Sequence, residues 1–150
     1  MRIAHLYWSL VLAAVPVMVG AQPSAVSLIA EGRDNVMQRW EVSPEKWRAQ
    51  SKWNPSLAGQ PPLPIAKAVE LAEAWLRKRH TDVSKMALSQ VVLRTQTQSG
   101  YGVEDHWFYR VEFQPMLAGR KVWGADLVAV VLFDGTVVVP QSEPYTSPMR

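Results

Sequence analysis

The stretch PIAKAVELAEAWLRKRH, residues 64–80, decides the expected fold of this chain. Its apolar side chains recur at steps of three and four residues, which predicts an amphipathic helix with one apolar stripe. The stripe comprises Ile65, Ala68, Val69, Ala72, Trp75 and Leu76. The alanines favour helix, and their small side chains allow the helix to lie close to a sheet. Glu73 and Arg77 form a stabilising pair at i and i+4.

After His80 the period of the apolar residues changes from 3.6 to 2, which predicts strands. Residues 87–97 alternate in part, and residues 106–114 alternate clearly until Pro115 ends the strand. In this second strand one face consists of Trp107, Tyr109, Val111 and Phe113. A half-buried strand of an antiparallel sheet has this pattern.

Residues 122–133 predict a third strand, which is apolar on both faces from Leu127 onward. Asp134-Gly135 is the strongest hairpin signal in the chain, because we expect both positions to adopt positive φ. The return strand is expected over residues 136–139, where Pro140 stops it.

This order predicts an α+β fold, with one long helix packed on a four-stranded antiparallel sheet and an irregular N-terminal lead. We expect the face that begins with Trp107 to contact the helix stripe at Val69, Ala72 and Leu76. The domain is expected over residues 37–140, after a flexible lead at 22–36 and before a loose tail at 141–150.

The first 21 residues resemble a signal peptide. Arg2 and His5 precede an apolar run of 14 residues from Leu6 to Val19, and small residues follow at Gly20 and Ala21. The run is short for a membrane span of ~20 residues. We therefore expect a periplasmic or secreted protein without a membrane span after cleavage, the alternative being an uncleaved N-terminal anchor.

Between the lead and the long helix, residues 37–42 predict a short strand. Ser43-Pro44-Glu45 predicts the start of a short helix that ends near Ala49, because serine caps helices and proline fits the first turn. A proline-rich connector follows. Its segment 61–64 matches the P-x-x-P pattern, so a ligand for a proline-binding module is the alternative to a stiff connector.

Composition excludes several classes of function. The chain has 150 residues and no cysteine, which excludes a disulfide scaffold, a cysteine nucleophile and a thiolate metal site. The net charge is only +3, and the one basic run, residues 77–80, falls in the last helical turn, where cations complement the helix dipole. We therefore expect no nucleic-acid partner.

No group of residues predicts catalysis, a cofactor or a metal ion. Glu104, Asp105 and His106 are adjacent, but neighbouring residues of a strand point to opposite faces. The residue types of a hydrolase triad also occur at His80, Asp82 and Ser84. These residues lie within five positions of the chain, whereas the members of a catalytic triad come from separate elements of the fold. We interpret residues 104–106 as a solvated hairpin end and residues 80–84 as a helix end followed by a turn. We therefore expect that the protein is not an enzyme.

The candidate binding residues are the tryptophans Trp40, Trp47, Trp53 and Trp123. Two hypotheses stay open. Trp40, Trp47 and Trp53 could pack the N-terminal segment onto the apolar face of residues 127–133. Alternatively, exposed tryptophans could bind a small ligand, a glycan or a protein.

Three stretches carry a resemblance to a family: AVELA at 68–72, WFYRVEF at 107–113 and VVLFDGTVV at 130–138. With them the chain resembles PepSY-like exported bacterial domains, whose layout is similar to the cystatin-like fold. The resemblance implies a non-catalytic interaction module in the cell envelope, with an unknown protein or peptide partner and modulation of a peptidase as one implied role. A sheet edge that accepts a partner strand is the expected contact.

Overall fold

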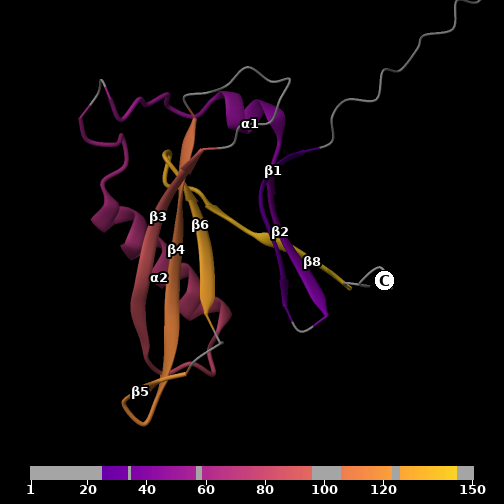
Figure 1. Ribbon diagram of the computed structural model, residues 1–150, viewed down its shortest axis with the longest axis vertical. Helices are drawn as coiled ribbons and strands as arrows, with labels where there is room; N and C mark the ends of the chain where they lie inside the picture. The colour runs from indigo at the N-terminus through magenta and orange to yellow at the C-terminus, as the bar shows by residue number, and fades with distance from the viewer. Residues whose placement is uncertain (1–24, 34, 57–58, 96–105, 123–125, 145–150) are drawn as a thin grey trace, which may run out of the picture.

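The computed structural model describes residues 25–33, 35–56, 59–95, 106–122 and 126–144 (Figure 1). These ranges form eight strands and two helices. In chain order they are β1 (Val26–Arg33), β2 (Val36–Val42), α1 (Pro44–Arg48), α2 (Ile65–Arg79), β3 (Met86–Thr95), β4 (Trp107–Leu117), β5 (Arg120–Lys121), β6 (Leu127–Leu132), β7 (Val137–Val138) and β8 (Pro140–Pro144).

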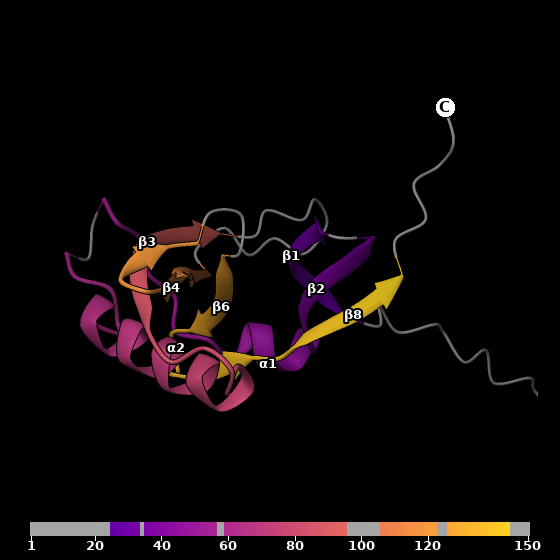
Figure 2. The ribbon, with the colours of Figure 1, turned by 90° about the horizontal axis from the view of Figure 1, so that it is seen from below.

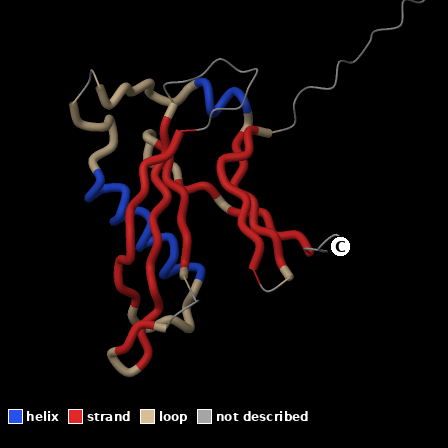
Figure 3. The backbone as a smooth tube through the Cα atoms, viewed as in Figure 1, coloured by secondary structure: helices blue, strands red, loops and turns tan. Residues whose placement is uncertain are grey.

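The predicted α+β fold, with one long helix on a four-stranded sheet, is wrong. The described chain is mostly strand and forms two sheets (Figure 3). The small sheet has the order β1-β2-β8, and the large sheet has the order β3-β4-β6-β7, with β5 paired to β4. Helix α2 has 15 residues and α1 has five. The prediction lacked the small sheet, whose outer strands lie in the expected lead and tail.

The expected flexible lead contains a regular strand. β1 pairs with β2 in antiparallel register from Val26↔Val42 to Arg33↔Val36. The register shifts between Ser27 and Ile29, so Leu28 and Ile29 are both buried although they are neighbours. This bulge breaks the period of two, which explains why the alternation in the sequence was not evident.

The expected loose tail also begins with a strand. β8 pairs with β2 from Trp40↔Pro140 to Val36↔Pro144, at the edge of the small sheet. Its side chains from Gln141 to Pro144 are all exposed, so no apolar pattern marks it in the sequence. Pro140 ends the pairing with the large sheet as predicted, but the chain continues directly into the small sheet.

Helix α2 and the large sheet pack as the sequence predicted. α2 lies along one face of the large sheet (Figure 2), and its buried residues Ala68, Ala72 and Leu76 belong to one core. The sheet side of this core includes Tyr109, Val111 and Phe113 of β4 together with Ala129 and Val131 of β6. The expected match between the helix stripe and the aromatic face of β4 is therefore confirmed.

A second core fills the space between the two sheets. The opposite face of the large sheet contributes Phe108, Val130, Leu132 and Val138. The N-terminal segment contributes Val26, Leu28, Ile29, Trp40, Val42 and Trp47. β6 is thus apolar on both faces because helix α2 covers one and the small sheet covers the other.

The short helix and the turns agree with most of their sequence signals. The Ser43 hydroxyl accepts a hydrogen bond from the Lys46 amide at 3.2 Å and caps α1. In the Asp134-Gly135 turn only Gly135 has positive φ, at 84°, so the expectation of two such residues is wrong. The expected end of the second strand at Pro115 is also wrong, because β4 continues to Leu117 and Pro115 pairs with Met86 of the edge strand β3.

Candidate binding cleft between the two sheets

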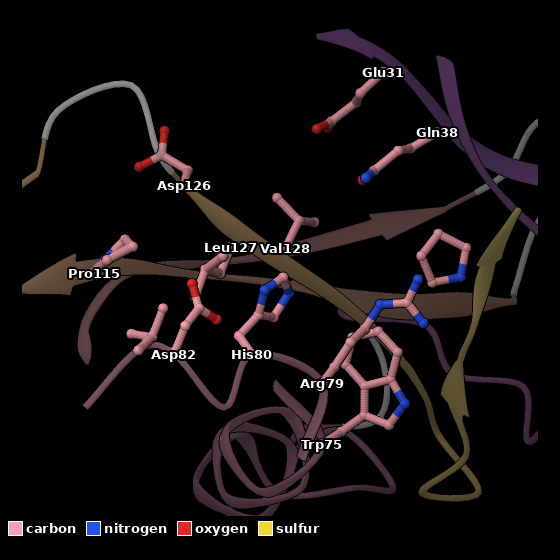
Figure 4. Close-up of a pocket in the computed structure, with 12 residues that line it drawn as sticks. Glu31, Gln38, Trp75, Arg79, His80, Asp82, Pro115, Asp126, Leu127 and Val128 are labelled. Carbon is pink, nitrogen blue, oxygen red and sulfur yellow. The ribbon is translucent and has the colours of Figure 1, made fainter. Parts of the chain in front are cut away.

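A pocket of about 480 Å³ lies where the open side of β6, the small sheet and the C-terminal end of α2 meet (Figure 4). Its volume is in the range of small-molecule sites. Its lining residues are Glu31, Gln38, Trp75, Arg79, His80, Asp82, Val83, Pro115, Asp126, Leu127, Val128 and Pro140. We call this pocket the inter-sheet cleft.

Part of the outer edge of β6 pairs with no strand among the residues that the structure describes. β6 begins at Leu127, but its ladder with β7 covers only Val130↔Val138 and Val131↔Val137. The Leu132 amide donates to the Thr136 carbonyl at 2.9 Å, so the backbone groups of Leu132 point toward β7. Because these directions alternate along a strand, the N–H and C=O of Val128 point to the same side. There they lie beyond the end of β7.

Proline explains why β7 stops short of Val128. Continuing the β6–β7 register by one hydrogen-bonded pair places residue 140 opposite Val128. This residue is Pro140, which has no N–H to donate to the Val128 carbonyl. The chain turns there into the small sheet, where Pro140 pairs with Trp40. Pro140 therefore marks the end of the β6–β7 ladder.

Three other edge strands of the described chain, β1, β3 and β8, carry features that discourage strand addition. β1 has a bulge between Ser27 and Ile29, and β3 has one between Leu88 and Gln90. β8 begins and ends with proline. Bulges and prolines are the usual devices that protect sheet edges. The edge of β6 lacks both at Val128 and is recessed between the sheets instead.

The C-terminal end of α2 forms the wall opposite the small sheet. The guanidinium carbon of Arg79 lies 5.3 Å from the centroid of the Trp75 ring, which is a cation–π contact. His80 ends the helix, and its N–H donates to the Leu76 carbonyl at 2.8 Å. The Val83 amide then donates to the His80 carbonyl at 3.1 Å, which closes a turn. This turn brings Asp82 into the lining of the cleft.

The small sheet contributes Glu31 and Gln38, and an ion pair fixes Glu31. The Arg110 guanidinium of β4 contacts the Glu31 carboxylate at 2.7 and 2.9 Å. Arg110 also pairs with Glu112, which in turn accepts a hydrogen bond from Gln90. The guanidinium of Arg110 is therefore shared between the carboxylates of Glu31 and Glu112.

Charged side chains line both ends of the cleft. Figure 4 shows Asp82 and Asp126 at one end and Arg79 on Trp75 at the other, with His80, Leu127 and Val128 between them. Asp126 directly precedes β6, so the acidic end coincides with the start of that strand.

The tryptophans named from the sequence lie elsewhere. Trp40 and Trp47 are buried in the core between the sheets, and Trp53 is buried in the core under α2. Trp53 packs edge-on against Trp107 at 5.7 Å. The positions of Trp40 and Trp47 agree with the packing hypothesis, whereas Trp53 packs on the opposite face of the large sheet, in the core under α2. None of the three rings is exposed. Trp123 lies outside the described residues.

The other groups considered in the sequence also differ in their positions. His106 is buried at the start of β4, with its ring 5.5 Å from that of Trp47, away from the cleft. Glu104 and Asp105 lie outside the described residues. His80 and Asp82 line the cleft, although the sequence indicated only a helix end and a turn. In the described ranges no three His, Cys, Asp or Glu residues form a group that could hold a metal ion.

Searches for related proteins identify no family for this chain. No family model, no curated protein and no solved structure matches it. The resemblance to PepSY-like domains therefore stays a prediction. Neither of the described helices has the length and apolar character needed to cross a membrane.

Proposed function

We propose that the protein is a non-catalytic interaction module of the cell envelope, which binds an extended peptide segment along the open edge of β6. The observation that carries this proposal is the register of β6 with β7, which covers only Val130↔Val138 and Val131↔Val137, whereas Val128 of the same strand lines the inter-sheet cleft. An extended peptide placed there would add a strand to the large sheet. The location follows from the predicted signal peptide at residues 1–21.

The dimensions of the cleft favour a short segment. Only Val128 within β6 offers an outward N–H and C=O without a β7 partner, so one residue of the sheet forms the contact. The three ligand residues that can reach its two groups span about 10 Å in an extended conformation. The pocket of about 480 Å³ limits the segment to a few residues.

The test measures binding of acetylated and amidated pentapeptides with varied central residues to the ¹⁵N-labelled protein. We expect at least some of them to shift the amide resonance of Val128 and to slow its hydrogen exchange. N-methylation of the ligand provides the matched control. Methylation at the residues that pair with Val128 should abolish binding, whereas methylation at the alternate residues should leave it within about twofold.

A protein variant tests the same contact from the other side. Val128→Pro removes the N–H that points into the cleft and no donor to β4, because Val128 pairs with Glu112 at a position where the backbone groups face away from β4. It should reduce peptide affinity at least tenfold with an unchanged circular dichroism spectrum. Binding of no peptide, or binding that N-methylation does not affect, would contradict the proposal even if this variant failed to fold.

A further inference from the structure

We infer that the peptide bound in the inter-sheet cleft carries a lysine or arginine opposite Val128, and that its cationic side chain binds the Glu31 carboxylate. This inference rests on the proposed function and specifies its ligand. Three observations support it: the face to which the Val128 side chain points, the polar pair on the facing wall of the small sheet, and the sharing of one guanidinium between two carboxylates.

The face of the ligand that meets the small sheet follows from the pairing of β6. Val128 packs against the core between the sheets, and it pairs with Glu112 of β4. Residues opposite each other on paired strands direct their side chains to the same face. A ligand residue opposite Val128 therefore points toward the small sheet, and its two neighbours point toward α2, as Leu127 does.

A polar pair, Glu31 and Gln38, forms this part of the inner face of the small sheet. The two residues pair across β1 and β2, two positions from the buried pair of Ile29 and Trp40. Because side chains two positions apart share a face, Glu31 and Gln38 also face the large sheet. Figure 4 shows both side chains pointing from the small sheet into the cleft. A ligand side chain opposite Val128 thus meets a carboxylate and an amide.

The Glu31 carboxylate has no cation of its own. Arg110 contacts Glu31 at 2.7 and 2.9 Å but also pairs with Glu112, so these three ionised groups together carry a formal charge of −1. Both contacts end at Oε1 of Glu31, and no residue in the described ranges donates a hydrogen bond to its Oε2. The Glu31 side chain is 35% exposed and lines the cleft. A ligand ammonium or guanidinium group can therefore donate to Oε2 and offset the surplus negative charge.

A long side chain suits the width of the cleft. Packed sheets lie roughly 10 Å apart, so a short side chain opposite Val128 would leave a gap to Glu31. The flexible stem of lysine or arginine lies along apolar surface and carries the charge to a polar end. Here the apolar surface is the Val128 side chain, and the polar end is Glu31.

Arg79, a cation in the lining, lies on the other wall. It belongs to α2, and its guanidinium carbon lies 5.3 Å from the centroid of the Trp75 ring. The ligand residue opposite Val128 points away from this wall, whereas its two neighbours point toward it. Repulsion from Arg79 therefore acts most strongly on cations at the neighbouring positions and least on the cation at Glu31.

The test measures the affinity of capped alanine pentapeptides for the full chain by calorimetry at low salt. Their central residue is lysine, Nε-acetyllysine or glutamate. We expect the lysine peptide to bind at least tenfold more tightly than the acetyllysine peptide, and the glutamate peptide to bind more weakly than both. Added salt should reduce the advantage of lysine.

Variants of the small sheet assign this advantage to Glu31. Glu31→Gln leaves Arg110 paired with Glu112, and Gln38→Lys places a cation beside Glu31. Either substitution should bring the affinities of the lysine and acetyllysine peptides within about twofold of each other. Glu143→Gln provides the matched control, because Glu143 also lies in the small sheet and pairs with an arginine but does not line the cleft. It should keep the wild-type ratio.

Equal affinity of the lysine and acetyllysine peptides for the wild type overturns the inference and leaves the proposed function standing. An advantage of lysine that persists in Glu31→Gln does the same. So does an advantage that disappears in Asp82→Asn instead, since the opposite wall would then hold the cation. Failure of every pentapeptide to bind overturns the proposed function itself.

Discussion

Arg110 of β4 and Glu31 of β1 form an ion pair between the two sheets, with nitrogen–oxygen distances of 2.7 and 2.9 Å. The Arg110 side chain is only 12% exposed and also pairs with Glu112, whose side chain is 9% exposed. This largely buried guanidinium therefore contacts two carboxylates, Glu31 on β1 and Glu112 on its own strand, β4. It adds a directional contact to the apolar core that holds the small sheet.

Arg110→Met should lower the free energy of unfolding by about 3 kcal/mol, because removing one partner of a buried ion pair leaves the other charge uncompensated. Urea unfolding followed by tryptophan fluorescence measures the change. The double variant Arg110→Met with Glu112→Gln should recover part of the loss, since it removes the orphaned charge as well.

The exposed pair between Arg39 and Glu143 provides the control for that prediction. Its nitrogen–oxygen distance is also 2.7 Å, but its side chains are 44% and 54% exposed. Arg39→Met should cost less than about 1 kcal/mol, as is usual for surface pairs. Equal losses at Arg39 and Arg110 would show that burial does not set the strength of the inter-sheet contact.

Helix α2 offers a second prediction, based on two alanines of the same helix. Ala72 is fully buried against the large sheet, whereas Ala74 is exposed. Ala72→Leu should destabilise the protein by roughly 1–3 kcal/mol, because the added atoms have no space in a packed core. Ala74→Leu should stay within about 0.5 kcal/mol. Similar effects of the two substitutions in thermal and urea unfolding would contradict the packing of α2.

The sequence predicted those parts of the fold whose burial follows a regular period. Helix α2 shows the period of 3.6, and β4 alternates over Trp107, Tyr109, Val111 and Phe113, so the sequence predicted both elements and their contact, although β4 continues past Pro115. The small sheet lacks such a signal. β1 loses its alternation at the Ser27–Ile29 bulge, and the exposed side chains of β8 give no apolar face.

The cleft could not be predicted for a related reason. Its central feature is a backbone edge, which depends on the register of β6 with β7 and on the position of Pro140 opposite Val128. Neither is a property of side-chain pattern within one element. The sequence did indicate the last turn of α2 and the turn that follows it. These residues line a cleft only because the small sheet lies opposite them, and the sequence did not predict that sheet.

The Asp134 carboxylate predicts that the protein loses stability at low pH. Burial raises the pKa of its carboxyl, but hydrogen bonds from Thr136 and Gln50 and the charge of Lys46 outweigh it, so the pKa lies below its ordinary value of 3.8. The carboxylate thus contributes stability that is complete above that value and is lost as the pH falls through the lower folded pKa.

Asp134→Asn should therefore be less stable than the wild type at pH 6, and the difference should shrink as the pH approaches 2. Urea midpoints measured across this range give the comparison. Both proteins share the remaining acid-sensitive groups, such as Glu45, so these cancel in the difference. A difference that stays constant with pH would contradict the assignment to the Asp134 carboxylate.

Tyr109 predicts the opposite dependence, at high pH. Its hydroxyl donates to the Leu63 carbonyl at 2.7 Å, and it is buried between α2 and the large sheet. Burial raises the pKa of this phenol above its ordinary value of 10.0, so its contribution is complete below pH 10 and is lost as the pH rises through the folded pKa. Tyr109→Phe removes the hydrogen bond and should cost about 1 kcal/mol near neutral pH. It should also remove this source of alkaline destabilisation, so the stabilities of variant and wild type should converge above pH 10 in urea unfolding. Parallel pH profiles for the two proteins would show that this phenol is not shielded from ionisation by the fold.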